Sequence, residues 1–127
     1  MTTRRIPRAP LASAKILNGG HELSVHDLKR QDDSFTLHYT IAPPLPNAGD
    51  ATPVLLSLEA MDDNGNAYFD RGGAYGAAGD GTHTPGSISA QPALAPKAGE
   101  IRVRLTFLRN GEEHPCHLML LTSATKP

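Results

Sequence analysis

The stretch from Val54 to Asp70, VLLSLEAMDDNGNAYFD, constrains the fold more than any other part of the chain. It joins two runs of β-favouring residues through Asp-Asn-Gly, the strongest short-range signal for a β-hairpin. Alternation along the first run predicts four core residues: Val54, Leu56, Leu58 and Ala60. A two-residue turn at Asn64-Gly65 predicts three cross-strand pairs: Glu59 with Asp70, Ala60 with Phe69, and Met61 with Tyr68.

A second hairpin is predicted at the C-terminal end, where Glu100 to Leu108 alternates and Asn110-Gly111 supplies a two-residue turn. The turn pairs the apolar positions of one face: Ile101 with Leu120, Val103 with Leu118, Leu105 with Cys116, and Phe107 with His114. On the other face Arg102 meets Met119, Arg104 meets His117, and Leu121 continues the row. This row is too apolar for a solvent face, so we expect the N-terminal segment or a second subunit to cover it. A homodimer through Arg102, Met119 and Leu121 is one such arrangement.

Further strands are predicted at 12–17, 21–30, 35–41 and 87–91. In the second of these, Leu28 has the wrong parity, which predicts a β-bulge near His26 or Asp27. Proline-bearing connections are expected at 42–53 and 92–99, and a glycine-rich loop without periodicity at 71–86.

Seven or eight short strands without a long helical period predict an all-β antiparallel sandwich of two sheets with an immunoglobulin-like outline. A small β-barrel is the alternative. The 127 residues suit one domain, assigned to 12–127 after a flexible N-terminal segment at 1–11.

Composition excludes several classes of protein. Twelve basic and thirteen acidic residues leave no global field to attract nucleic acid or an anionic membrane. Cys116 is the one cysteine, so no intramolecular disulfide forms. No apolar run has the length of a membrane span. A cytoplasmic location is expected for the chain as given, with an extracytoplasmic location as the alternative if a leader was removed.

Acidic side chains near the central hairpin suggest a cation site. Glu59, Asp62 and Asp70 form an oxygen-rich group in the predicted register, which suits calcium and would relieve the repulsion between Glu59 and Asp70. The alternative is that Asp-Asn-Gly serves the turn and that Arg71 balances the charge. A histidine and cysteine site at 114–117 is disfavoured because His117 points away from His114 and Cys116 in a regular strand.

The glycine-rich loop carries four candidate binding residues: Arg71, Tyr75, Asp80 and His83. It lacks GxxxxGK[ST] and a following helix, so a phosphate site is disfavoured. No serine lies on a GxSxG elbow, and no cofactor motif is present.

The order DDNGNAYFD, glycine-rich loop, SIS strand, proline connection and EIRVRLTF resembles the immunoglobulin-like β-sandwich modules of unknown function in bacterial proteins. The resemblance covers about residues 21–122. It implies a non-enzymatic binding or spacer module whose loops contact a protein or carbohydrate partner. The alternative is a small all-β enzyme or metal-dependent module with its site between loop 71–86 and the 54–70 hairpin.

Overall fold

The computed structural model describes residues 10–45, 54–76 and 81–122. These residues form eight β-strands that pair in antiparallel fashion. In chain order the strands are β1 (Ala12–Ile16), β2 (His21–Arg30), β3 (Phe35–Ala42), β4 (Leu55–Asp62), β5 (Ala67–Tyr75), β6 (Thr84–Gln91), β7 (Glu100–Arg109) and β8 (Glu112–Leu121).

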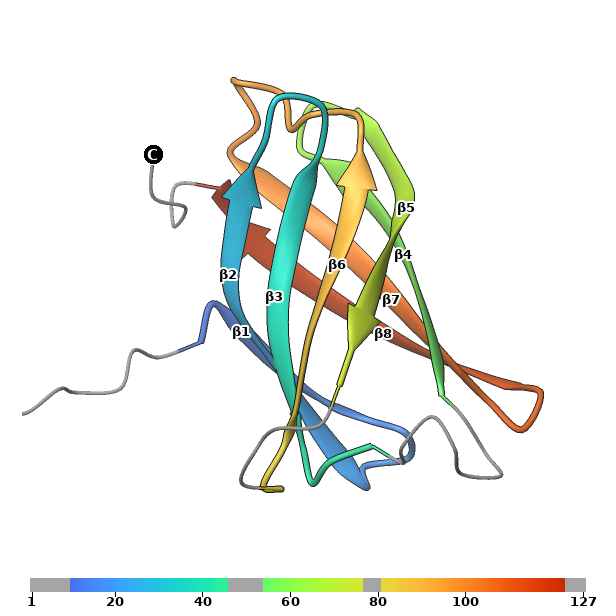
Figure 1. Ribbon diagram of the computed structural model, residues 1–127. Helices are drawn as coiled ribbons and strands as arrows, with labels where there is room; N and C mark the ends of the chain where they lie inside the picture. Colours follow the sequence, from blue (N-terminus) through green and yellow to red (C-terminus); the bar gives the residue numbers. More distant parts are fainter. Residues whose placement is uncertain (1–9, 46–53, 77–80, 123–127) are drawn as a thin grey trace, which may run out of the picture.

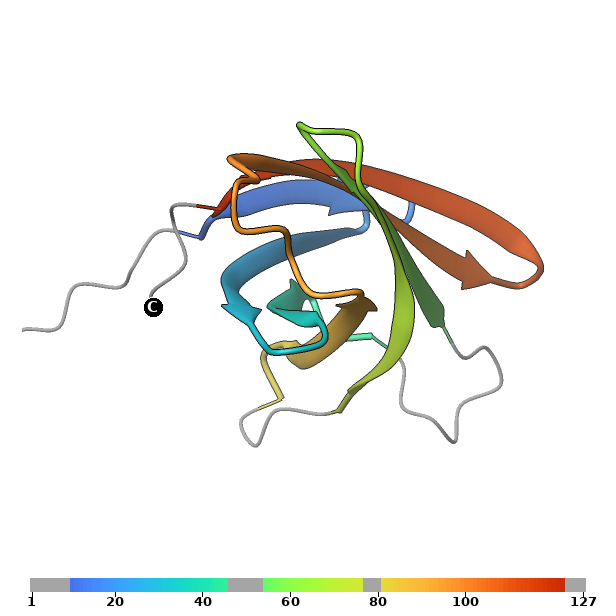
Figure 2. The ribbon, with the colours of Figure 1, turned by 90° about the horizontal axis from the view of Figure 1, so that it is seen from above.

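All eight strands belong to one sheet, in the order β1-β2-β3-β6-β5-β4-β7-β8 (Figure 1). The sheet curls until its two edge strands, β1 and β8, lie side by side without a shared ladder, so the barrel is nearly closed (Figure 2). The all-β prediction is confirmed, and the barrel alternative is the one supported. The two-sheet sandwich was wrong, because β3 pairs with β6 and β4 pairs with β7, which joins the two halves into a continuous ladder.

The core fills the inside of the barrel with the alternate side chains of each strand. Phe35 and Tyr68 meet edge to face there, with ring centroids 5.4 Å apart. Leu94 and Ala98, from the connection between β6 and β7, are buried over one end. The predicted flexible segment at 1–11 falls mostly outside the described residues, but Leu11 donates a backbone hydrogen bond to Val25.

The register of the C-terminal hairpin is as predicted, from Ile101 opposite Leu120 to Phe107 opposite His114. Its turn residues, Asn110 and Gly111, have φ angles of 55° and 77°, as a two-residue hairpin turn of this type requires. The predicted bulge in β2 is also confirmed, since the register shifts between Val25 and Asp27 and leaves His26 as the extra residue.

The central hairpin differs from its predicted register by one residue. Glu59 pairs with Phe69, Ala60 with Tyr68, and Met61 with Ala67. The amide of Asp62 bonds to the carbonyl of Asn66, so the loop has three residues, and Gly65 adopts a φ of 87°. Because one step of register exchanges the two faces, Tyr68 enters the core and Phe69 lies outside, which is the reverse of the prediction.

Most of the described residues in the predicted loop at 71–86 are strand. β5 continues to Tyr75 and β6 begins at Thr84, with a register shift at Arg71. Two glycines in this stretch, Gly73 and Gly86, permit close packing of neighbouring strands: a Cβ on Gly86 would lie 2.5 Å from the ring of Tyr39, its partner on β3. At these two positions glycine therefore marks a close approach of neighbouring strands.

Candidate functional site: an outer groove across β5, β4, β7 and β8

Strands β5, β4, β7 and β8 run side by side in the barrel wall (Figure 2). A groove of about 540 Å³ lies on the outer face of these strands. Strand alternation places its outward side chains, because the intervening residues on each strand enter the core. We call this surface the outer groove. Its outward-facing side chains are Glu59, Met61, Ala67, Phe69, Arg102, Arg104, His117 and Met119.

Strand pairing arranges these side chains in two rows that cross the sheet. The first row runs Phe69, Glu59, Arg104, His117, and the second runs Ala67, Met61, Arg102, Met119. Arg102 therefore stands between two methionines, and Arg104 stands between Glu59 and His117. The predicted pairs of Arg102 with Met119 and Arg104 with His117 are confirmed.

Large apolar side chains are exposed on this side of the barrel. Met61 and Met119 are each 52% exposed and Phe69 is 60% exposed. Among the described residues, every exposed large apolar side chain belongs to β4, β5, β7 or β8, the others being Leu55, Leu121 and, at 36%, the less exposed Leu108. Such a concentration on one side of a small protein is typical of an interaction surface.

The outer side of the remaining strands is polar. Thr36 on β3 and Ser89 on β6 share a hydrogen bond of 2.7 Å between their hydroxyl groups. His26 bonds through Nε2 to the hydroxyl of Thr40 at 2.8 Å. The two sides of the barrel thus differ in chemistry, and in the described part of the chain the exposed large apolar side chains lie on one of them.

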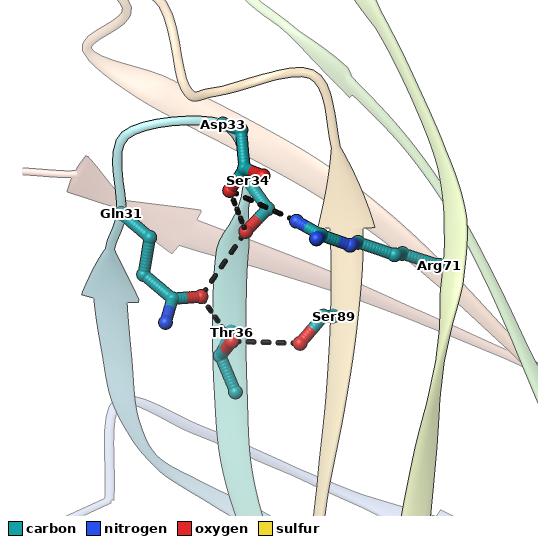
Figure 3. Close-up of polar contacts among 6 residues, drawn as sticks. All are labelled: Gln31, Asp33, Ser34, Thr36, Arg71 and Ser89. Atoms are coloured by element: carbon teal, nitrogen blue, oxygen red, sulfur yellow. Dashed lines mark hydrogen bonds and ion pairs between the residues drawn. The ribbon is translucent and has the colours of Figure 1, made fainter.

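Among the predicted loop residues, Arg71 contacts a neighbouring turn. Arg71 forms an ion pair of 2.9 Å with Asp33 in the β2–β3 turn, where Ser34, Gln31 and Thr36 continue the polar contacts (Figure 3). The hydrogen bonds from Arg71 and Ser34 lower the pKa of Asp33. Arg71 therefore fixes the bulge of β5 to the β2–β3 turn.

Two further predicted loop residues, Tyr75 and His83, make hydrogen-bonding contacts of their own. The hydroxyl of Tyr75 donates a hydrogen bond of 2.6 Å to the carbonyl of Val54, the residue before β4. His83 contacts the hydroxyl of Thr82. Asp80 lies outside the described residues. The structure thus shows Arg71 and Tyr75 in separate contacts.

Two of the three predicted calcium ligands accept hydrogen bonds that hold the backbone. The buried carboxylate of Asp62 accepts from the amides of Asn64 and Asn66, from Asn66 Nδ2 and from the hydroxyl of Tyr68, at 2.7–2.9 Å. Burial would raise the pKa of Asp62, but the hydrogen bonds from Asn66, Tyr68 and Asn64 outweigh it and lower the pKa to about 2.

Asp70 joins β5 to β4 where their ladder ends. Its carboxylate accepts from the amide of Leu58 at 3.0 Å and from the amide of Gly72 at 2.6 Å. Glu59 instead faces outward in the outer groove, and the predicted pairing of Glu59 with Asp70 was wrong. Within the described ranges, no group of three or more His, Cys, Asp or Glu side chains could hold a metal ion.

Sequence reasoning found half of the outer groove. The parity of β8 identified Met119, with Arg102 opposite and Leu121 beyond the groove. Phe69 was missed because the register error placed it inside. The residue that could have indicated the correct register is Asp62, two positions before Asn64. Its carboxylate accepts hydrogen bonds from the amides of Asn64 and Asn66, and these bonds favour a longer loop than a two-residue turn.

Comparison of the chain with protein-family models, curated proteins and solved structures found no match. In the part of the chain that the structure describes, no helix has the length and apolar character needed to cross a bilayer.

Proposed function

We propose that the protein is a non-enzymatic binding module and that a partner protein contacts the outer groove. The observation that supports this proposal is the gathering of exposed Met61, Phe69 and Met119 around Arg102 in a groove of about 540 Å³. Methionine, arginine and aromatic side chains are enriched at protein interfaces. A protein partner is favoured over a carbohydrate because Phe69 is the one aromatic residue whose side chain points into the groove.

The contacts of the ionisable groups support a binding role over catalysis. Asp62 and Asp70, two acids of the hairpin that borders the alternative enzyme site, accept hydrogen bonds from backbone amides. Burial, with a smaller contribution from Tyr75, raises the pKa of Tyr39 to about 12, and burial raises the pKa of the Cys116 thiol. These groups are protonated at neutral pH and do not line the groove, so their shifts follow from packing.

Site-specific photo-cross-linking tests the proposal. A photoreactive phenylalanine analogue replaces Met119 in the groove or, as a matched control, the exposed His38 on the polar side of the barrel. We expect irradiation of cells that make the protein to give an adduct of discrete mass with the Met119 variant alone, with a second protein identified in it. Adducts from neither position would favour a spacer role, and equal adducts from both would contradict a specific groove.

A further inference from the structure

The charges of the outer groove are unbalanced. Arg102 and Arg104 face Glu59 alone, so the permanent charges of the groove give a net charge of +1. Arg104 is opposite Glu59 in the register, yet no ion pair joins them within the described part of the chain. Both guanidinium groups are thus free to bind carboxylates from outside.

The two arginines also define a spacing. They are alternate residues of β7, so both leave the same face of the strand, with Cα atoms about 7 Å apart. Carboxylates on alternate residues of an extended peptide have the same spacing. An extended acidic segment lying along β7 therefore places one carboxylate on each arginine.

Apolar side chains border the line of arginines on both sides. Met61 on β4 and Met119 on β8 flank Arg102, and Phe69 lies one strand beyond Glu59 in the next row. Methionine side chains are flexible and polarizable, so they adapt to apolar groups of varied shape. Burial of such groups adds about 25 cal/mol for each Å² of apolar surface removed from water. A partner with carboxylates and apolar side chains matches the groove better than a plain polyanion.

We propose that the outer groove binds an extended acidic segment of a partner protein, with carboxylates at alternate positions and apolar side chains beside them. This inference rests on the proposed function. Charge favours this occupant over a second copy of the chain. Two grooves placed face to face would bring four arginines together with two glutamates, and unbalanced like charges oppose association.

Binding of synthetic peptides, followed by fluorescence anisotropy, tests the proposal. The probe is a labelled peptide that alternates glutamate with leucine and phenylalanine. One control peptide carries glutamine in place of glutamate, and a second carries serine in place of the apolar residues. We expect the probe to bind at least tenfold more tightly than either control, with an affinity that falls as salt is added.

Protein variants locate the binding. The double change Arg102→Gln and Arg104→Gln should weaken binding of the probe at least tenfold. Its matched control, Arg30→Gln with Arg109→Gln, removes the same charge outside the groove and should leave binding within twofold. Unchanged melting temperatures would show that both variants are folded.

Several results would overturn the proposal. The first is failure of the probe to bind, and the second is a control peptide that binds as tightly as the probe. Equal losses of probe affinity in the two double arginine variants would also contradict it. A dimer seen by light scattering that Met119→Lys dissociates would assign the groove to a second copy. Unless the groove is assigned to a second copy, cross-linking of Met119 to another protein would still support the proposed function, so failure of the peptide test is distinct from failure of that function.

Discussion

The hydroxyl of Tyr68 donates a hydrogen bond of 2.7 Å to Oδ2 of Asp62 inside one end of the barrel. The same hydroxyl accepts a hydrogen bond of 3.0 Å from the amide of Ala95, in the connection between β6 and β7. Through these two contacts the Tyr68 side chain, which lies in the core, links the β4–β5 turn to the connection between β6 and β7. They also set the register that places Tyr68 inside and Phe69 in the outer groove.

Loss of the Asp62 charge should destabilise the protein. In Asp62→Asn the side chain keeps its size but offers one acceptor oxygen to the donors of Asn64, Asn66 and Tyr68. Leaving buried donors without an acceptor costs about 1–3 kcal/mol. Urea denaturation at pH 7 measures the free energy of unfolding. Asp32→Asn, on an exposed side chain, is the control and should change it by less than about 0.5 kcal/mol.

Acid should destabilise the wild-type protein through Asp62. The folded pKa of about 2 is below the ordinary value of 3.8, so this contribution to stability is complete above pH 4. It is lost as the pH falls from about 4 towards 2, when the carboxyl group becomes protonated. Urea midpoints across this range should fall more steeply for wild type than for Asp62→Asn. Parallel curves would show that other carboxyl groups carry the acid sensitivity.

The two hairpins show what the sequence could predict and what it could not. Asn110-Gly111 fixed the C-terminal register because both residues adopt positive φ and the flanking strands alternate without interruption. The same dipeptide at Asn64-Gly65 gave the wrong register, because hydrogen bonds to Asp62 produce a three-residue loop. A turn motif therefore predicts a reversal, whereas nearby side-chain acceptors decide its length.

The barrel could not be distinguished from a sandwich by local patterns. Both architectures bury alternate residues, and the difference lies in the pairing of β3 with β6 and of β4 with β7. These pairs join strands separated in the sequence by two others, so no short-range signal encodes them. The outer groove depends on the second pairing, which brings Met61 beside Arg102.

A methyl group at Gly86 should disturb the contact between β6 and β3. In Gly86→Ala the new Cβ would lie 2.5 Å from the Tyr39 ring, and overpacking of this kind costs about 1–3 kcal/mol. Gly76→Ala is the matched control because nothing lies within 4 Å of its added Cβ, and its melting temperature should stay close to that of wild type. Combining Gly86→Ala with Tyr39→Leu should cost less than the sum of the single changes. Additive losses would refute the close contact.

Alanine substitution at two adjacent aromatic residues separates the observed register from the one expected from the turn. Tyr68 is 1% exposed and contacts Phe35, so Tyr68→Ala should lower the free energy of unfolding by about 3–5 kcal/mol. Phe69 is 60% exposed, so Phe69→Ala should change it by less than about 1 kcal/mol. Urea denaturation of both variants measures the difference. The predicted two-residue turn requires the opposite ranking, because it places Phe69 in the core, so a larger loss at Phe69 would overturn the register on which the outer groove depends.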